Sequence, residues 1–326
     1  RKSGRSSAEP MVVTTYGNST LRPAIHTGSS TGLPSAWDRT RSHLRFVGLR
    51  LFPHQRSSTP TGMSFVGPVE DVLIEDCYIY GYAIGIVFQG DEDARSSDVR
   101  IRRTIVGNSW ATGQHSEGIF IRSTDGITIE GCVIDHNGWH PQFPSQSRTI
   151  FNHNVYIQRD VTGLTFRDNF VARGSSHGLQ ARNGGIVEGN VFYQNPISIL
   201  WGNGGDVGLG DQPIRGRVAD NAVLEGVDLL DQGRGWGIHI QNAMEGRVSN
   251  NILANSKSVS NTTWGISVRG PDQAQVRNLD ITGNIVYDWY NSVSIADENA
   301  VSVRVAQNQL VGTDSLEQLV DHRNTS

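Results

Sequence analysis

The hydrophobic positions of this chain follow a short unit that returns along most of its length. Each unit alternates apolar and polar residues, continues with two or three small or polar residues, and ends on an apolar pair. Clear copies occupy residues 72–79, 99–106 and 127–134. Apolar residues at every second position predict β-strands with one buried face. The units therefore predict a chain built from many short strands that are separated by turns rich in Gly and Asn.

The units share one aligned position that holds small residues. This column reads Cys77, Thr104, Cys132, Asn169, Asn190, Asn221, Asn251, Asn284 and Asn308. The mean spacing of about 29 residues, with strand periodicity, is typical of a solenoid with one coil per repeat. Stacked Asn amides could then bond the turn backbone and the next coil, about 4.8 Å away. Cys77 and Cys132 would lie two coils apart, too far for a disulfide, so we expect two buried free thiols.

A second strand follows the unit in most coils, for example at 118–122, 154–158 and 237–241. With the Asn column, these strands give the chain a resemblance to right-handed parallel β-helices of the pectate-lyase-like kind over residues 44–312. The resemblance implies an all-β, right-handed parallel β-helix of about ten coils with an internal Asn ladder. We expect one domain over residues 1–326: an early coil and connecting loop (1–43), the main solenoid (44–312) and an end segment (313–326). This fold hosts lyases, hydrolases, epimerases, tailspikes and adhesins, so it does not settle the chemistry.

Composition narrows the classes of partner. Charged residues are 18% of the 326, the formal net charge is −4, and no apolar run approaches the roughly 20 residues of a membrane span. We therefore expect neither a nucleic-acid nor a membrane partner, and a monomer. All the basic residues except Lys2 and Lys257 are Arg. Codon usage would explain this, and so would a ligand rich in carboxylates, which Arg binds in a bidentate way.

The period of two sorts the second strands into faces, and the outward face is rich in aromatic and Arg side chains. Outward-facing residues on a solenoid are not needed to fill the core, so this mixture of side chains favours a carbohydrate-binding groove. We expect substrate contacts from Glu117, Arg122, Trp139, Asn154, Gln180, Trp201 and His239.

Histidines locate the centre of that groove. His153 and His177 each stand just before a second strand, so they should stack at one corner of adjacent coils, with Glu117 one coil earlier. The coil between Cys132 and Asn169 is the longest. Its extra segment, with Trp139, His140, Phe143 and Arg148, is expected to overhang the groove. The stretch from Asn152 to Tyr156 resembles a His-Asn-x-Tyr sequence of secreted β-helix carbohydrate enzymes, which implies export to the periplasm or medium.

These residues suit β-elimination on an acidic, uronate-containing polysaccharide. The reaction needs a neutralised carboxylate, a base for the C5 proton and an acid for the departing O4. We predict His153, Tyr156 and His177 as the proton-transfer groups and Arg182 as the carboxylate-binding cation. Lys257 is the only internal lysine and lies several coils away, so a Lys base is not expected.

Alternatives remain at this point. A glycoside hydrolase would need a carboxylate pair, for which only Glu117 and Asp135 are near. A non-catalytic binding or tailspike-like β-helix is the other alternative. A uronate epimerase would share the first step of elimination, but the Asp-Pro-His-Asp run expected of alginate epimerases is absent. No cofactor and no metal site are expected. Calcium could bind the acidic turn at residues 91–93, although a solvated turn explains it better.

Overall fold

The computed structural model describes most of the chain. The described residues are 3–18, 20–34, 39–56, 59–142, 146–202, 214–256, 263–269, 276–296, 300–312 and 320–322. Their regular structure consists of strands that form three parallel sheets of eleven strands each. We call them sheets A, B and C.

Sheet A contains β1 (Met11–Val13), β4 (Arg41–Val47), β7 (Val69–Glu75), β10 (Ser96–Arg102), β13 (Thr124–Glu130), β16 (Thr162–Arg167), β19 (Gly184–Glu188), β22 (Ile214–Ala219), β25 (Ala243–Ser249), β28 (Arg277–Thr282) and β31 (Val301–Ala306). Sheet B contains β2 (Ala24–His26), β5 (Arg50–Phe52), β8 (Tyr78–Tyr80), β11 (Ile105–Gly107), β14 (Val133–Asp135), β17 (Phe170–Ala172), β20 (Val191–Tyr193), β23 (Ala222–Leu224), β26 (Ile252–Ala254), β29 (Ile285–Tyr287) and β32 (Gln309–Val311). Sheet C contains β3 (Leu33–Pro34), β6 (Thr61–Val66), β9 (Ile84–Gln89), β12 (Glu117–Arg122), β15 (His153–Ile157), β18 (His177–Ala181), β21 (Ile197–Gly202), β24 (Trp236–Gln241), β27 (Trp264–Val268), β30 (Asn291–Ile295) and β33 (Val320–His322).

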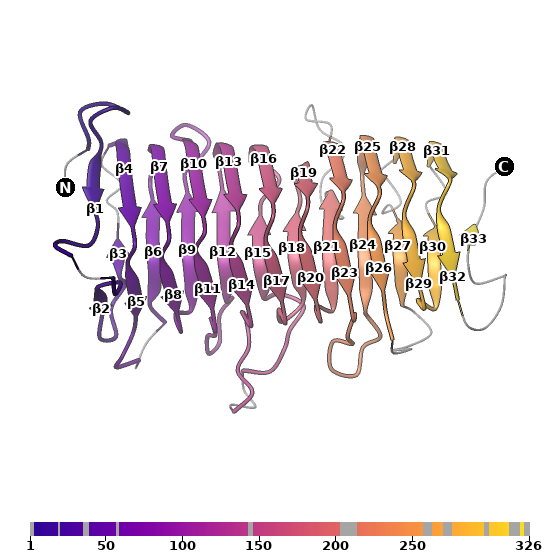
Figure 1. Ribbon diagram of the computed structural model, residues 1–326, viewed down its shortest axis with the longest axis horizontal. Helices are drawn as coiled ribbons and strands as arrows, with labels where there is room; N and C mark the ends of the chain where they lie inside the picture. The colour runs from indigo at the N-terminus through magenta and orange to yellow at the C-terminus, as the bar shows by residue number, and fades with distance from the viewer. Residues whose placement is uncertain are drawn as a thin grey trace.

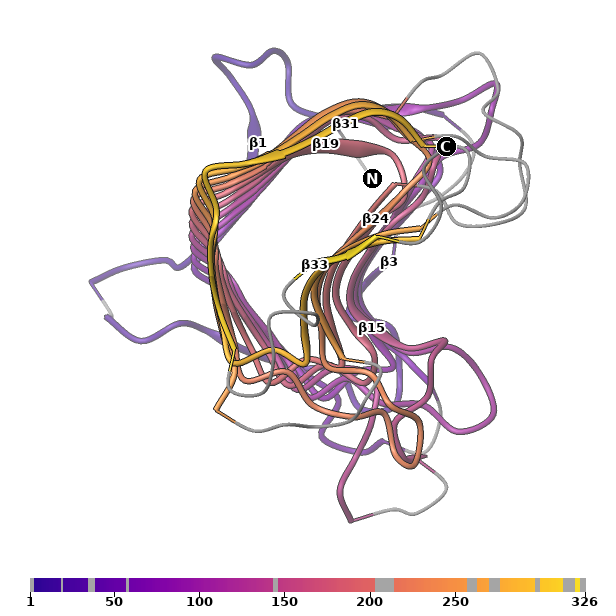
Figure 2. The ribbon, with the colours of Figure 1, turned by 90° about the vertical axis from the view of Figure 1, so that its right-hand side faces the viewer.

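One strand from each sheet makes one coil, and successive coils stack along the long axis from the N-terminus to the C-terminus (Figure 1). Seen along this axis, the three sheets surround the interior of the coil, and longer connections project from the corners on both sides of sheet C (Figure 2). The buried hydrophobic residues inside form one continuous core. The expected all-β, right-handed parallel β-helix is confirmed. Its eleven coils slightly exceed the roughly ten that repeat counting predicted.

The core follows the predicted period of two. Ile86, Ile119, Val155, Leu179 and Ile238 are fully buried and stand in register on consecutive or nearby strands of sheet C. Burying one such side chain contributes roughly 1.5–3 kcal/mol. Because each coil repeats this contribution, the solenoid is stabilised along its whole length rather than at one centre.

The predicted Asn ladder is present at the corner between sheets A and B. The Oδ1 of each Asn from Asn190 to Asn308 accepts hydrogen bonds from the backbone N–H and the Nδ2 of the Asn one coil earlier, at 2.9–3.0 Å. Asn169 accepts from the backbone N–H of Cys132 in the same way. Both cysteines are buried free thiols, as expected.

The ladder corner needs a left-handed backbone just before it. Asp168, Asp220 and Asn250 have φ values of 56°, 57° and 57°, and Gly189 and Gly283 take the same place in other coils. Asp, Asn and Gly tolerate this region better than other residues. The Asp/Asn/Gly–Asn pairs in the sequence therefore encode the turn.

Trp201 corrects one sequence expectation. It was expected in the groove, yet it is fully buried, and its Nε1 donates to the carbonyl of Gly185 at 3.1 Å. The register places Trp201 beside Ala181 and Ile240, one residue away from the alignment that the repeat suggested. A slip of one residue in a strand exchanges its inward and outward faces. Gly246, across the core, leaves room for the indole ring.

Candidate active site

A cavity of about 690 Å³ lies on the outer face of sheet C, over strands β6 to β18. A volume of this size is typical of small-ligand sites. Its lining includes five of the residues predicted from sequence: Glu117, His153, Tyr156, His177 and Gln180. Connections project beside both edges of sheet C (Figure 2).

Three ionisable residues stand in one row across the cavity. Parallel pairing sets Glu117 beside His153 and His153 beside His177, each at the first position of its strand. The expected corner stack is therefore confirmed. Each of the three side chains is only 3% exposed. Burial penalises charge, so it raises the pKa of Glu117 to about 8 and lowers the pKa of His153 to about 3. It also lowers the pKa of His177 well below its usual value. At neutral pH the whole row is uncharged.

The two imidazoles meet through their Nδ1 atoms, which lie 3.0 Å apart. Each Nδ1 also lies 2.9 Å from the Oγ of Ser176. That hydroxyl donates to the carbonyl oxygen of Asn152 at 2.6 Å. The ring orientations are thus fixed from behind, and both rings line the cavity. Ser176 itself was not predicted, because its side chain lies before the strand and no strand period applies there.

Tyr156 and Arg182 form the next layer of the site. The Tyr156 hydroxyl accepts a hydrogen bond of 3.0 Å from Nη1 of Arg182. The phenol ring packs edge-on against His153, with ring centroids 4.9 Å apart. Tyr156 lines the cavity, whereas Arg182 lies outside its lining. Arg182 therefore reaches this site through the Tyr156 hydroxyl.

Amide side chains complete the floor of the cavity. Gln180 stands beside Tyr156 in the outward column, and Gln89 and Gln158 line the same space. The Oε1 of Gln180 is buried and has no hydrogen-bond partner within the described part of the chain. An amide in this position can bind a hydroxyl or a carboxylate of a ligand.

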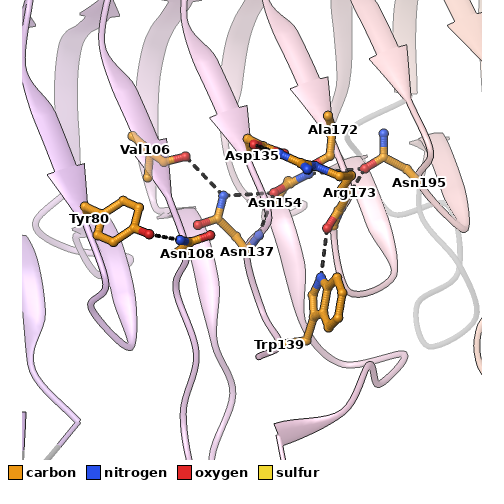
Figure 3. A network of polar contacts seen from close by, with 11 residues as sticks. Tyr80, Val106, Asn108, Asp135, Asn137, Trp139, Asn154, Ala172, Arg173 and Asn195 are labelled. Carbon is orange, nitrogen blue, oxygen red and sulfur yellow. Dashed lines mark hydrogen bonds and ion pairs between the residues drawn. The ribbon is translucent and has the colours of Figure 1, made fainter. Parts of the chain in front are cut away.

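The long connection before β15 supplies a wall, but with different residues from those expected. Ile150 and Phe151 line the cavity with His115, whose Nδ1 lies 3.2 Å from the carbonyl oxygen of Phe151. The predicted contact Trp139 instead stacks on His136, with ring centroids 4.2 Å apart. Its Nε1 donates to the carbonyl of Arg173 (Figure 3). Its other face meets Arg148, and His140 contacts Trp110. Phe143 lies outside the described residues.

Asn154 is a further correction. It was expected to contact substrate, yet it is fully buried in a second, shorter ladder (Figure 3). Its Oδ1 accepts from Asn137, and its Nδ2 donates to the carbonyl of Ala172 and to Asn195. Strict alternation from Tyr156, which lines the cavity, would turn Asn154 outward, so the corner at the start of β15 departs from the period of two. Asn154 therefore holds the corner that carries His153.

Two other predicted contacts lie outside the cavity lining. Arg122 is exposed and its Nε lies 3.7 Å from a carboxylate oxygen of Asp160. His239 is buried, with Nδ1 2.6 Å from the Ser267 hydroxyl and Nε2 2.8 Å from Nε2 of Gln241. Leu200 separates His239 from Gln180 in the column.

The remaining carboxylates near the site have structural partners. Asp135, on sheet B, is paired with Arg173 through Oδ1 and Nε at 2.9 Å (Figure 3). Asp91 accepts from the backbone N–H of Asp93 and of Ala94, which closes the acidic turn. Among the residues described, no group of three or more His, Cys, Asp or Glu is arranged to hold a metal ion. Lys257 lies outside the described residues.

The family model of the right-handed β-helix region matches residues 61–214, which contain the whole cavity row. No curated protein matches the chain. Among solved structures, the A-module of mannuronan C-5 epimerase from Azotobacter vinelandii superposes with a TM-score of 0.57 at 14% identity, over 93% of this chain and 78% of that one. Alginate lyase from Paenibacillus sp. str. FPU-7 gives 0.45 at 15% identity, over 94% and 86% of the two chains.

A surface adhesin of Streptococcus pneumoniae gives a TM-score of 0.48 at 14% identity, over 87% of this chain and 74% of the adhesin. Similarity at these identities establishes the fold alone, because one fold carries many functions. Enzymes and a non-enzyme stand among the similar structures. No helix in the described residues is long and apolar enough to cross a membrane.

Proposed function

We propose that this protein is an exported polysaccharide lyase that cleaves an acidic, uronate-containing polymer by β-elimination in the cavity on sheet C. One observation carries the proposal: two uncharged imidazoles, a tyrosine hydroxyl bound to Arg182, and the buried carboxyl of Glu117 share that cavity. These groups match the three tasks of the reaction, which are carboxylate neutralisation, C5 deprotonation and O4 protonation.

In this proposal, the carboxylate of the substrate is stabilised by Arg182, Glu117 and Gln180. The C5 proton of a uronate becomes acidic enough only when the adjacent carboxylate is stabilised as negative charge grows. Arg182 places a positive charge behind the Tyr156 hydroxyl. The raised pKa of Glu117, about 8, keeps its carboxyl protonated near neutral pH, so it can donate a hydrogen bond instead of repelling the substrate.

The two proton transfers fall to two of the three residues Tyr156, His153 and His177. All three line the cavity, and the edge-on packing of Tyr156 against His153 sets the phenol next to the imidazole pair. A positioned acid or base contributes about 10²- to 10⁴-fold to a rate. The reaction breaks the C5–H and C4–O4 bonds, forms a C4–C5 double bond, and returns a proton to O4.

Glycoside hydrolysis fits the cavity less well. It needs two carboxyl groups about 5–9.5 Å apart across the sugar. Glu117 is the one acidic residue in the described lining, and the other nearby candidate, Asp135, pairs with Arg173 on sheet B. This scheme does not use calcium, because Arg182 supplies the positive charge and the protonated Glu117 donates a hydrogen bond. The protein would act as a monomer, with neither nucleic acid nor membrane as a partner.

The test is a time course of ultraviolet absorbance on a panel of acidic polysaccharides, each with and without a chelator. An absorbance rise from the C4–C5 unsaturated uronate, unaffected by the chelator, is expected on at least one polymer. Reducing ends should increase in parallel.

Three other outcomes would replace the proposal. Reducing ends without the absorbance would identify a hydrolase. A changed proton NMR spectrum of the polymer, without chain cleavage, would identify a C5 epimerase. Retention of the protein on an immobilised polymer, with no chemical change, would identify a binding protein.

A further inference from the structure

The contact between His153 and His177 determines which nitrogen atoms of the two rings carry protons. Their Nδ1 atoms are 3.0 Å apart, a hydrogen-bond distance, and both rings are neutral. A neutral imidazole carries one N–H and one lone pair. Two lone pairs, or two N–H groups, would repel each other across this contact. A hydrogen bond across this contact requires one ring to carry its proton on Nδ1 and the other to carry it on Nε2.

Ser176 removes the simplest alternative. A serine hydroxyl could serve both rings by donating to one and accepting from the other, without any proton between the nitrogen atoms. Here Ser176 Oγ lies 2.6 Å from the carbonyl oxygen of Asn152 and 3.1 Å from that of Ile150, and both of these oxygens can only accept its proton. Ser176 Oγ can then only accept from an Nδ1–H, at 2.9 Å from either ring. The Ser176 oxygen therefore accepts a hydrogen bond from the ring that carries the Nδ1 proton, and it donates no proton to the other ring.

The opposite ends of the rings face different surroundings. Both imidazoles line the cavity. Within the described residues, the hydrogen bonds of the two rings all involve Nδ1 and none involves Nε2. The ring with the Nδ1 proton has a free lone pair on Nε2, so it is a base. The ring with a bare Nδ1 has a proton on Nε2, so it is an acid.

We infer that His153 and His177 form a reciprocal tautomer pair, positioned by Ser176, which moves a proton from C5 to O4 of the uronate through their shared Nδ1 contact. This inference rests on the proposed lyase function. The base ring takes the C5 proton on Nε2 and passes its own Nδ1 proton to Nδ1 of the other ring. That ring releases its Nε2 proton to O4 as the C4–O4 bond breaks. One proton enters the pair and one leaves, and the two tautomers have exchanged.

This relay resolves a difficulty of the buried site. A single histidine that accepted the C5 proton would become an imidazolium ion in a site where both rings are 3% exposed. Burial makes that charged form costly. In the relay neither ring holds two protons, so no buried cation forms. The exchanged pair regains its first arrangement when the proton returns across the Nδ1 contact and Nε2 exchanges with water.

The direct test is a long-range proton–nitrogen NMR correlation on the whole protein, deuterated and labelled with ¹⁵N-histidine, at neutral pH. Loss of signals in His153→Gln and His177→Gln assigns the two rings. We expect one ring to carry Nδ1–H and the other to carry Nε2–H. The same pattern in both rings overturns the inference, whether both carry Nδ1–H or both carry Nε2–H. The second of these would also result from a metal ion bound to both Nδ1 atoms.

A pair of serine variants tests the positioning role. Ser176→Ala should lower kcat about tenfold, the effect of one lost hydrogen bond, with little change in KM. Ser176→Thr, which keeps a hydroxyl, should restore most of the rate. Ser267→Ala is the matched control, because it removes the same kind of Ser–His contact from His239, outside the cavity lining. Equal losses in Ser176→Ala and Ser267→Ala would overturn the positioning role.

The two proposals can fail separately. If the rings show opposite tautomers but no polymer yields an unsaturated product, the lyase function and the relay fall, while the tautomer assignment stands. If an unsaturated product forms and the rings share one pattern, the lyase stands and the relay is wrong.

Discussion

Strands β12, β15 and β18 differ sharply from strands β21, β24 and β27, although all six belong to sheet C and follow one register. In the first group, Glu117, His153 and His177 open onto the cavity. In the second, Ile197 and Trp236 take the positions that follow His177, and Leu200 and Trp264 are 7% and 8% exposed. The backbone of a β-helix therefore supplies equivalent positions, and the side chains decide which of them become a site.

The two groups of strands also show that a buried histidine is not by itself a functional one. His153 and His239 are both buried, and burial lowers the pKa of each to about 3. Each also contacts a serine hydroxyl. Of the two, His153 lines the cavity on sheet C and meets a second imidazole, whereas His239 lies outside the lining of that cavity. A depressed histidine pKa is thus a sign of burial, and the neighbouring space and partner indicate chemistry.

The largest expected difference between the two groups of strands is the loss of activity when their histidines are replaced. His153→Gln and His177→Gln should each lower kcat about 10³- to 10⁴-fold, because each removes a proton-transfer group. His239→Gln should stay within a few-fold of the parent protein. Initial rates of unsaturated product formation measure all three. A loss in His239→Gln as large as the other two would extend the active site into the second group.

The next largest effect is expected on stability, from a core residue in the second group of strands. Trp201→Ala should lower the free energy of unfolding by about 3–5 kcal/mol, because it leaves a large cavity where a fully buried indole stood. Denaturant titration, followed by circular dichroism, measures this loss. Trp139→Ala is the control, since its ring stacks on His136 at the surface of the long connection. Similar losses in the two variants would contradict the inward placement of Trp201.

A variant of Tyr156 tests the role of its hydroxyl in the first group of strands. Tyr156→Phe should lower kcat about 10²-fold, because it removes the hydroxyl that accepts from Arg182 and leaves the ring packing against His153 in place. Tyr80→Phe, on sheet B, is the matched control and should retain full activity. Full activity in Tyr156→Phe would exclude its hydroxyl from proton transfer.

The pH dependence of stability tests the buried carboxyl of Glu117. Glu117 has a folded pKa of about 8, above its usual 4.5, so its contribution is complete below pH 4.5 and is lost as the pH rises through 8. Glu117→Gln should remove this loss, which amounts to at most about 1.4 kcal/mol per pH unit. Melting temperatures between pH 3 and 9 measure the difference between the two proteins.

The acid side of the same melting series is an internal control. The pKa values of His153 and His239, lowered to about 3, mean that the unfolded chain binds more protons than the folded one between pH 3 and 6.5. Stability should fall as the pH drops through that window in both the parent protein and Glu117→Gln. Parallel curves above pH 4.5 would show that Glu117 is ionised in the folded protein.

Sequence patterning alone determined the solenoid, because each coil repeats the same short-range signals. The period of two gave the inward column of Ile119, Val155 and Leu179, and the Asn column gave the ladder from Asn169 to Asn308. The repeat also predicted that Glu117, His153 and His177 lie together, since residues at equivalent places in successive coils must be neighbours.

Tertiary structure decided what depends on register and on irregular connections. The register of β21 turned Trp201 inward, the inner corner recruited Asn154, and the long connection placed Phe151, and not Trp139, on the cavity. Ser176 reached both imidazoles from a corner where no period applies. A one-residue shift or a turn costs little in local pattern but redirects a side chain completely, so packing between coils alone could select these outcomes.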